Sequence, residues 1–207
     1  MTLHVPSVHC FFHTHPWSID ALTKAGIGDL SHTLLIELAA QSQLATLLNK
    51  QHTPRVGIAG LLADPNCLNE LVISTPRFPL PVVLAPNPPI SDAAQVSAVA
   101  LLPSVRSAFE RFIVFIHLAD FERFRYALPY CDKFSFLWDV ADPAMFKMGE
   151  LGAILRDFGV LNRSSWGGFY WYNHPRRQIK NIAARAAELK KMLGQMKKIP
   201  TLNATPS

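Results

Sequence analysis

Histidines are concentrated near the start of the chain, where four of the eight fall within the first fifteen residues. His13 and His15 directly follow an apolar stretch, Val8–Phe12, that we expect to form a strand. Two imidazoles at one strand end can bind one metal ion, and His117, after another apolar stretch, could add a third ligand. One hypothesis is therefore a metal-dependent hydrolase that uses His13, His15 and His117. The alternative is that these histidines lie in loops and only titrate near pH ~6.5.

A carboxylate lies near the end of the next apolar stretch. Residues Leu34–Leu38 read LLIEL, which is a short buried-strand pattern that contains Glu37. After a few polar residues, apolar residues resume at helical spacing from Leu44 to Leu48. We therefore expect a strand that ends in a carboxylate and is followed by a helix.

The same stretch, LLIELAAQSQLATLL, resembles a strand of the ParA/MinD-type (deviant Walker) ATPases, which reads roughly LLIDLDPQGNLATLL. Glu37 stands where the family has its first Asp and Gln41 where it has its Gln, whereas alanines replace the second Asp and the Pro. VVLAPNPP (Val82–Pro89) is an independent match to the family's vlPaGPNPP. The resemblance runs from about Leu34 to Asn173. It implies a single-domain, doubly wound α/β fold with a mainly parallel sheet flanked by helices, as in P-loop NTPases.

Two charges with which the resembled family handles phosphates are missing from the matching positions. The family carries K-G-G-x-G-K-[ST] after its first strand, whereas this chain reads HTHPWS there and has Asp29 at the lysine position of KAGIGDL (Lys24–Leu30). We interpret KAGIGDL as a helix C-cap and turn. The family's Walker B strand ends in Asp, and here RFIVFIHL has His117. His117 is either a hydrogen-bonded histidine or a general base, and hydrolysis by the family's mechanism is not expected.

The last strand that we expect, GFYWYN, contains four consecutive aromatic residues. Strand alternation sends Phe169 and Trp171 to one face and Tyr170 and Tyr172 to the other, so one pair must face helices or a partner. In the resembled family the Asn at the strand's end contacts adenine; Asn173 could keep that role or cap a helix. The candidate interface residues are Phe169, Tyr170, Trp171, Tyr172, Arg176 and Arg177.

Composition indicates a globular protein, because 49% of the residues are hydrophobic and only 17% are charged. No apolar run approaches the ~18 residues that a membrane span needs, and no signal peptide is recognisable at the start. The three cysteines lie far apart without a CxxC pair, which is typical of buried, reduced thiols. We therefore expect a cytoplasmic protein.

Positive charge is concentrated in the tail, where 176–198 holds eight Lys or Arg residues and one Glu. The division that we expect is an α/β domain at 1–175, a basic amphipathic helix at 176–200 and a disordered tail at 201–207. The helix has an apolar and a basic face, so it could dock on its own sheet, contact an anionic membrane, meet a partner helix or bind phosphates.

Together these patterns favour a non-catalytic ParA/MinD-like pseudo-ATPase that needs no cofactor and acts as a protein-interaction or assembly module. The resemblance implies a homodimer or heterodimer in a bacterial partition, positioning, secretion or surface-assembly machine. The basic C-terminal helix could add peripheral contact with the inner membrane. Its vestigial nucleotide-contact positions would be Glu37, Gln41, His117 and Asn173. The alternatives are the metal-dependent hydrolase and a membrane- or nucleic-acid-binding module, and nucleic acid is the least expected partner.

Overall fold

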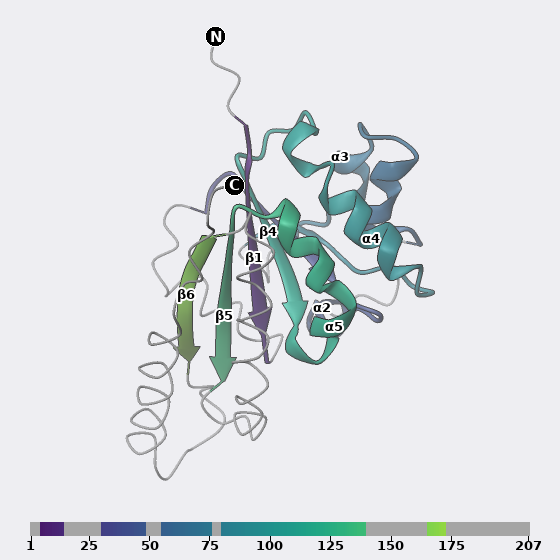
Figure 1. The fold of residues 1–207 in the computed structure, drawn as a ribbon. Helices are drawn as coiled ribbons and strands as arrows, with labels where there is room; N and C mark the ends of the chain where they lie inside the picture. Colours follow the sequence, from purple (N-terminus) through teal and green to yellow (C-terminus); the bar gives the residue numbers. More distant parts are fainter. Residues whose placement is uncertain (1–4, 15–29, 49–54, 76–79, 140–164, 173–207) are drawn as a thin grey trace, which may run out of the picture.

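The computed structural model describes residues 5–14, 30–48, 55–75, 80–139 and 165–172. Six strands form one sheet in the order β3-β2-β4-β1-β5-β6, and every neighbouring pair is parallel. The arrows labelled β1, β4, β5 and β6 point the same way in Figure 1. The strands are β1 (Ser7–His13), β2 (Thr33–Leu38), β3 (Val82–Val83), β4 (Arg111–His117), β5 (Lys133–Asp139) and β6 (Ser165–Tyr172).

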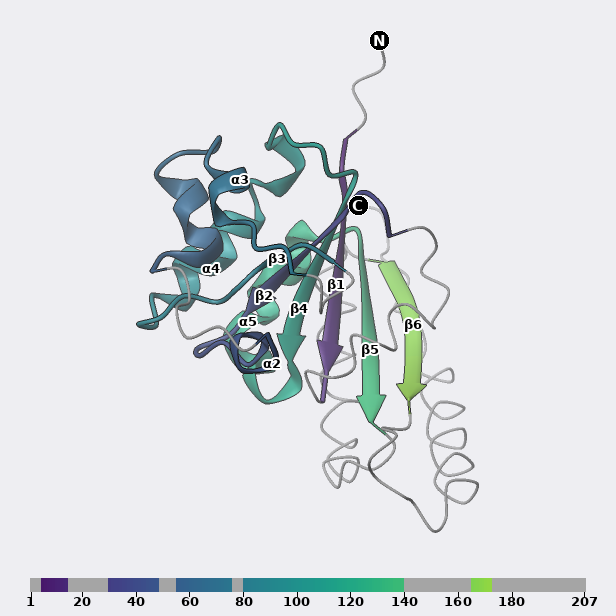
Figure 2. The ribbon, with the colours of Figure 1, turned by 180° about the vertical axis from the view of Figure 1, so that it is seen from behind.

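Short helical segments connect the strands. The α-helices are α2 (Leu44–Leu47), α3 (Leu68–Leu71), α4 (Asp92–Val99) and α5 (Phe121–Phe124). The 3-10 helices are η2 (Gly57–Leu62), η3 (Leu102–Ser104), η4 (Leu118–Asp120) and η5 (Arg125–Tyr130). The layers are clear in two views: α3, α4 and α5 lie on one side of the sheet (Figure 1), and α2 lies on the other (Figure 2).

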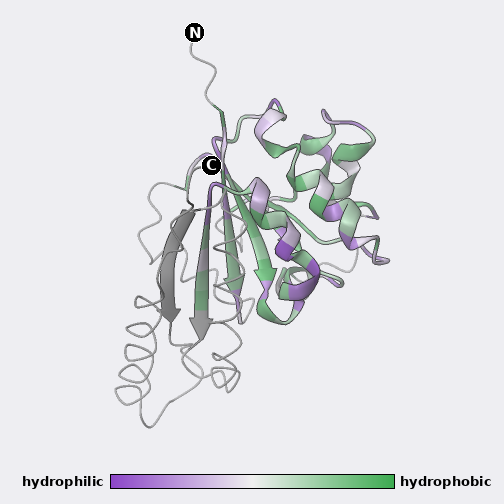
Figure 3. Ribbon diagram, viewed as in Figure 1, coloured by the Kyte–Doolittle hydropathy of each residue, from purple (hydrophilic) through white to green (hydrophobic). Residues whose placement is uncertain are grey.

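The doubly wound parallel sheet predicted from the sequence is confirmed. The apolar stretch RFIVFIHL forms β4, which pairs with β2 on one side and β1 on the other. Its residues Phe112–Ile116 are fully buried, as expected for a parallel strand that is covered on both faces. Figure 3 shows β4 green along most of its length, while α4 and α5 alternate between green and purple.

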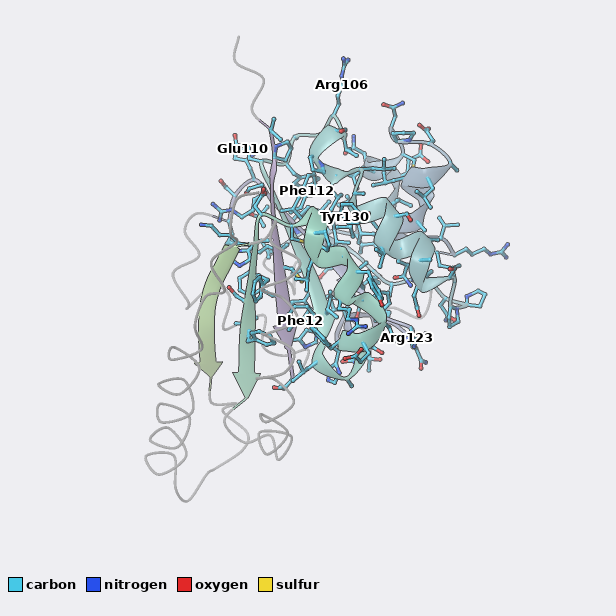
Figure 4. All side chains as sticks on the ribbon, viewed as in Figure 1. Phe12, Arg106, Glu110, Phe112, Arg123 and Tyr130 are labelled. Carbon is cyan, nitrogen blue, oxygen red and sulfur yellow. The ribbon has the colours of Figure 1, made fainter. Side chains whose placement is uncertain are left out.

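Strand alternation divides the core into two layers. On the α4 face, Cys10 and Phe12 of β1 and Phe112 of β4 pack with residues of α4, α5 and η2. On the α2 face, Phe11 and Phe115 pack with Leu44 and its neighbours from α2. In Figure 4 Phe12 and Phe112 are labelled in the α4-face layer, and Arg106 extends away from it. The α4-face layer is the larger of the two in the described part of the chain.

Two expectations fall on residues that the structure does not describe. They are the KAGIGDL turn apart from Leu30, and the tail at 176–207. The proposed division into 1–175, 176–200 and 201–207 thus stays a prediction. Among the described helices, none is long and apolar enough to cross a membrane.

Candidate functional site at the carboxyl edge of the sheet

The strand order has a topological switch point between the neighbours β1 and β4. β2, which follows β1 in the chain, lies beyond β4 in the sheet, and β5, which follows β4, lies beyond β1. The chain therefore leaves these two neighbours in opposite directions along the sheet. In open α/β sheets, ligands bind at the carboxyl ends of the strands at such a switch point. The residues at this carboxyl edge are His13 and Thr14 at the end of β1, Glu37 to Ala39 at the end of β2, and His117 to Asp120 at the end of β4.

The structure brings His13 and His117 together at the switch point. They are partners in the β1–β4 register, and their rings meet edge to face with centroids 5.3 Å apart. His13 is 3% exposed and stacks on Phe115, with ring centroids 3.7 Å apart and planes 9° from parallel. The His13 imidazole is therefore packed into the α2-face layer of the core.

Both ring nitrogens of His117 are used by the backbone. The Ala119 N–H donates to Nδ1 at 3.1 Å, and Nε2 lies 3.0 Å from the carbonyl oxygen of Thr14. Because Nδ1 accepts a hydrogen bond, the ring proton is on Nε2, which donates to Thr14. The imidazole is then neutral and joins the ends of β1 and β4 across the switch point. In this arrangement neither nitrogen is available to a metal ion or a substrate proton.

His15 lies outside the described residues, so the three-histidine metal site stays a prediction. In the part of the chain that the structure describes, no three side chains of the metal-binding types are grouped so that they could hold an ion.

Glu37 is buried at the end of β2, and its carboxylate accepts hydrogen bonds from two segments, Ser42–Leu44 and Ala85. The Gln43 and Leu44 N–H groups donate to Oε1 at 2.8 and 2.9 Å. The Ala85 N–H, just after β3, donates to Oε2 at 3.1 Å, and the Ser42 hydroxyl donates to the same oxygen. Burial raises the pKa of Glu37, and these four donors oppose that shift.

Gln41, the other β2-side position that the resemblance marks, has an exposed side chain on the connection that follows. The remaining positions lie elsewhere: Phe169–Tyr172 belong to β6, the last strand in the sheet order, and Asn173, Arg176 and Arg177 are outside the described residues.

A charged group beyond β4 was not anticipated from the sequence. Arg123 of α5 forms a two-pronged ion pair with Asp92 of α4, at 2.9 and 3.1 Å, and its Nη1 lies 3.9 Å from Asp120. Figure 4 labels Arg123 beside α5. Burial raises the pKa of Asp120, and the Arg123 guanidinium opposes that shift. The i, i+3 spacing of Asp120 and Arg123 was a readable signal, but Asp92 lies 31 residues from Arg123.

No family model and no curated protein matches the sequence. Solved structures match its fold. The MinC:MinD cell division complex of Aquifex aeolicus is 13% identical, with a TM-score of 0.63, over 92% of this chain and 78% of that chain. A ParA family ATPase from Chlorobium tepidum is 12% identical, with a TM-score of 0.61, over 92% and 81%. Apo McdA of Cyanothece is 12% identical, with a TM-score of 0.60, over 91% and 82%. The fold is therefore that of the ParA/MinD-type ATPases.

Proposed function

We propose that this chain is a pseudo-ATPase: it keeps the ParA/MinD fold, does not hydrolyse ATP, and serves as a protein-interaction or assembly module. The observation that carries the proposal is which residue stands at the switch point and what its side chain binds. His117 stands where the resemblance implies the Walker B carboxylate, and both of its nitrogens bond to the backbone of the β1 and β4 ends. A neutral imidazole cannot hold magnesium through water as a carboxylate does.

The sequence at the positions of the family's phosphate loop also supports the loss of ATP hydrolysis. Phosphates bind where backbone N–H groups and a lysine point at one anion. The segment after β1 reads HTHPWS, and the later KAGIGDL has Asp29 at the lysine position. A carboxylate there would repel a triphosphate. On this account ATP lacks both a cation for its phosphates and a carboxylate for its magnesium.

The interaction role rests on the kind of proteins that share the fold. One structural neighbour is a MinC:MinD cell division complex, and another is the chimerical protein CapA2B2. We propose that this chain likewise works as a dimer or with a different protein, in a partition, positioning, secretion or surface-assembly machine. With the nucleotide switch lost, its association would be constitutive.

Light scattering and phosphate release test the proposal on the full chain. We expect no magnesium-dependent release of phosphate from ATP, and a molar mass that is the same with and without ATP and magnesium. The matched control is His117→Gln, which adds no charge at the end of β4 and should therefore give the same two results. Magnesium-dependent turnover that a single substitution abolishes, or a dimer that forms only with ATP, would refute the proposal.

The competing function is a metal-dependent hydrolase, because His13 and His117 are close. Metal binding would require His117 to give up its bond to Ala119 or to Thr14. Elemental analysis of the purified full chain separates the two. We expect no stoichiometric zinc or manganese and no change in metal content in His13→Ala. Stoichiometric metal that is lost in His13→Ala would favour the hydrolase over the pseudo-ATPase.

A further inference from the structure

We propose that the connection from β2 to α2, residues 39–43, is clamped by the chain itself, so that no ligand is needed to set its conformation. This β2–α2 connection lies at the carboxyl edge beside the switch point. The inference concerns contacts internal to the chain and goes beyond the proposed loss of ATP hydrolysis. The carboxyl edge is then preformed, so a partner that binds there does not have to order the β2–α2 connection.

The first part of the clamp is Glu37. Its two oxygens hold the Ser42 hydroxyl and the N–H groups of Gln43 and Leu44, which closes the far end of the connection back onto β2. The same carboxylate holds the Ala85 N–H after β3, 48 residues away. Glu37 is only 4% exposed, so water does not compete for these bonds.

Ser42 extends the clamp into α2. Its hydroxyl donates to Glu37 and also accepts the Ala45 N–H at 3.0 Å. This second bond satisfies one of the N–H groups that the first turn of a helix leaves without a partner. The carboxylate and the hydroxyl together therefore fix both the direction in which α2 leaves the connection and its first turn.

Gln95 holds the connection from the opposite face of the sheet. It lies in α4, is fully buried, and its Nε2 donates to the carbonyl oxygen of Ala39 at 3.3 Å. The near end of the connection is thus tied to α4, and the far end is tied to β2 and β3 through Glu37. Ligand-responsive loops have few buried contacts and open easily, whereas this connection is anchored at both ends.

The chemistry of the bonds predicts which substitutions release the clamp. All four partners of Glu37 donate, so the ionised carboxylate satisfies them without a proton. Glu37→Gln keeps the size but turns an NH2 group toward either the Ala85 N–H or the Gln43 and Leu44 N–H groups, which leaves buried donors without an acceptor. Ser42→Ala removes one donor and one acceptor while the remaining Glu37 bonds stay, so it is the milder variant.

Amide hydrogen exchange on the full chain, with and without ATP and magnesium, tests the clamp. We expect the Gln43, Leu44 and Ala45 amides to be protected without nucleotide and unchanged by ATP and magnesium. Loss of a bond of this kind should accelerate exchange about tenfold, at the Gln43 and Leu44 amides in Glu37→Gln and at the Ala45 amide alone in Ser42→Ala. The control is Gln41→Ala, a change to an exposed side chain on the same connection, which should leave these amides protected.

Fast exchange of Gln43 and Leu44 in the unmodified chain, or protection that appears only with ATP and magnesium, would overturn the clamp. Unchanged protection in folded Glu37→Gln would also overturn it. The proposed function fails separately: ATP binding that leaves these amides unchanged would contradict the pseudo-ATPase and support the clamp.

Discussion

Gly57 is the residue at which the fold has no room for a side chain. Its φ is +47°, and a Cβ built there would lie 2.9 Å from the Leu84 carbonyl oxygen and from Cδ of Pro86. The start of η2 is therefore pressed against the end of β3, and only glycine accepts both the backbone conformation and the contact.

We expect Gly57→Ala to lower the free energy of unfolding by about 2–4 kcal/mol, from the left-handed conformation and the clash with Leu84 together. Gly60→Ala is the control, because its Cβ would meet mainly side-chain atoms, the nearest at 3.3 Å. Urea denaturation followed by circular dichroism measures both. Equal effects of the two substitutions would contradict this assignment.

The tautomer of His117 is a second expectation at this scale. The two backbone bonds require the proton on Nε2. Nitrogen-15 NMR of the imidazole at neutral pH should therefore show the Nε2–H tautomer, and His117→Ala should cost about 1–3 kcal/mol through the loss of the Ala119 and Thr14 contacts. A ring with its proton on Nδ1 would be incompatible with the bond from Ala119.

At the scale of elements, β1 carries a histidine whose titration is displaced by its surroundings. Burial first, then Lys133 and Arg111, lower the pKa of His9 from 6.5 to about 4, and its Nε2 lies 2.9 Å from the Ser135 hydroxyl of β5. Between pH 6.5 and about pH 4, His9 therefore binds a proton in the unfolded chain and not in the folded chain. The contribution of His9 to the stability of the fold is fully present above its unfolded pKa of 6.5. This contribution is lost as the pH falls from there toward about 4.

We expect His9 to lower the free energy of unfolding by up to roughly 3 kcal/mol between neutral pH and about pH 4. His9→Gln, which cannot titrate but can still bond to Ser135, should lose that part of the dependence. Urea titrations of both chains at a series of pH values give the difference, in which other groups cancel. Parallel stability curves for the two chains would contradict the assignment.

The elements that could be predicted are those whose structure follows from the sequence pattern of a single segment. The apolar runs that became β1 and β4 each carry their own pattern, so their place in a parallel sheet could be inferred from sequence. The use of Glu37 could not, because one of its donors, Ala85, is 48 residues away and is a backbone group that any residue supplies. The resemblance marked Glu37 as a vestigial nucleotide contact, and the structure places it in a buried hydrogen-bonded cluster.

At the scale of the whole molecule, the tail at 176–207 gives a separate test. If the basic helix makes the chain a peripheral membrane protein, removal of 176–207 should abolish salt-sensitive binding to vesicles that contain anionic lipids. Vesicles of neutral lipid are the control, and double-stranded DNA is the matching probe for a nucleic-acid role. Absence of binding by the full chain would remove the tail as a contact site and leave the α/β domain as the interaction module.

The central claim is that the ParA/MinD fold is retained here without a triphosphate site. Calorimetric titration of the full chain with ATP and magnesium tests it most directly, with the ParA family ATPase from Chlorobium tepidum, which shares the fold, as the positive control. We predict no heat of binding up to millimolar ATP. A magnesium-dependent dissociation constant in the micromolar range would contradict the claim.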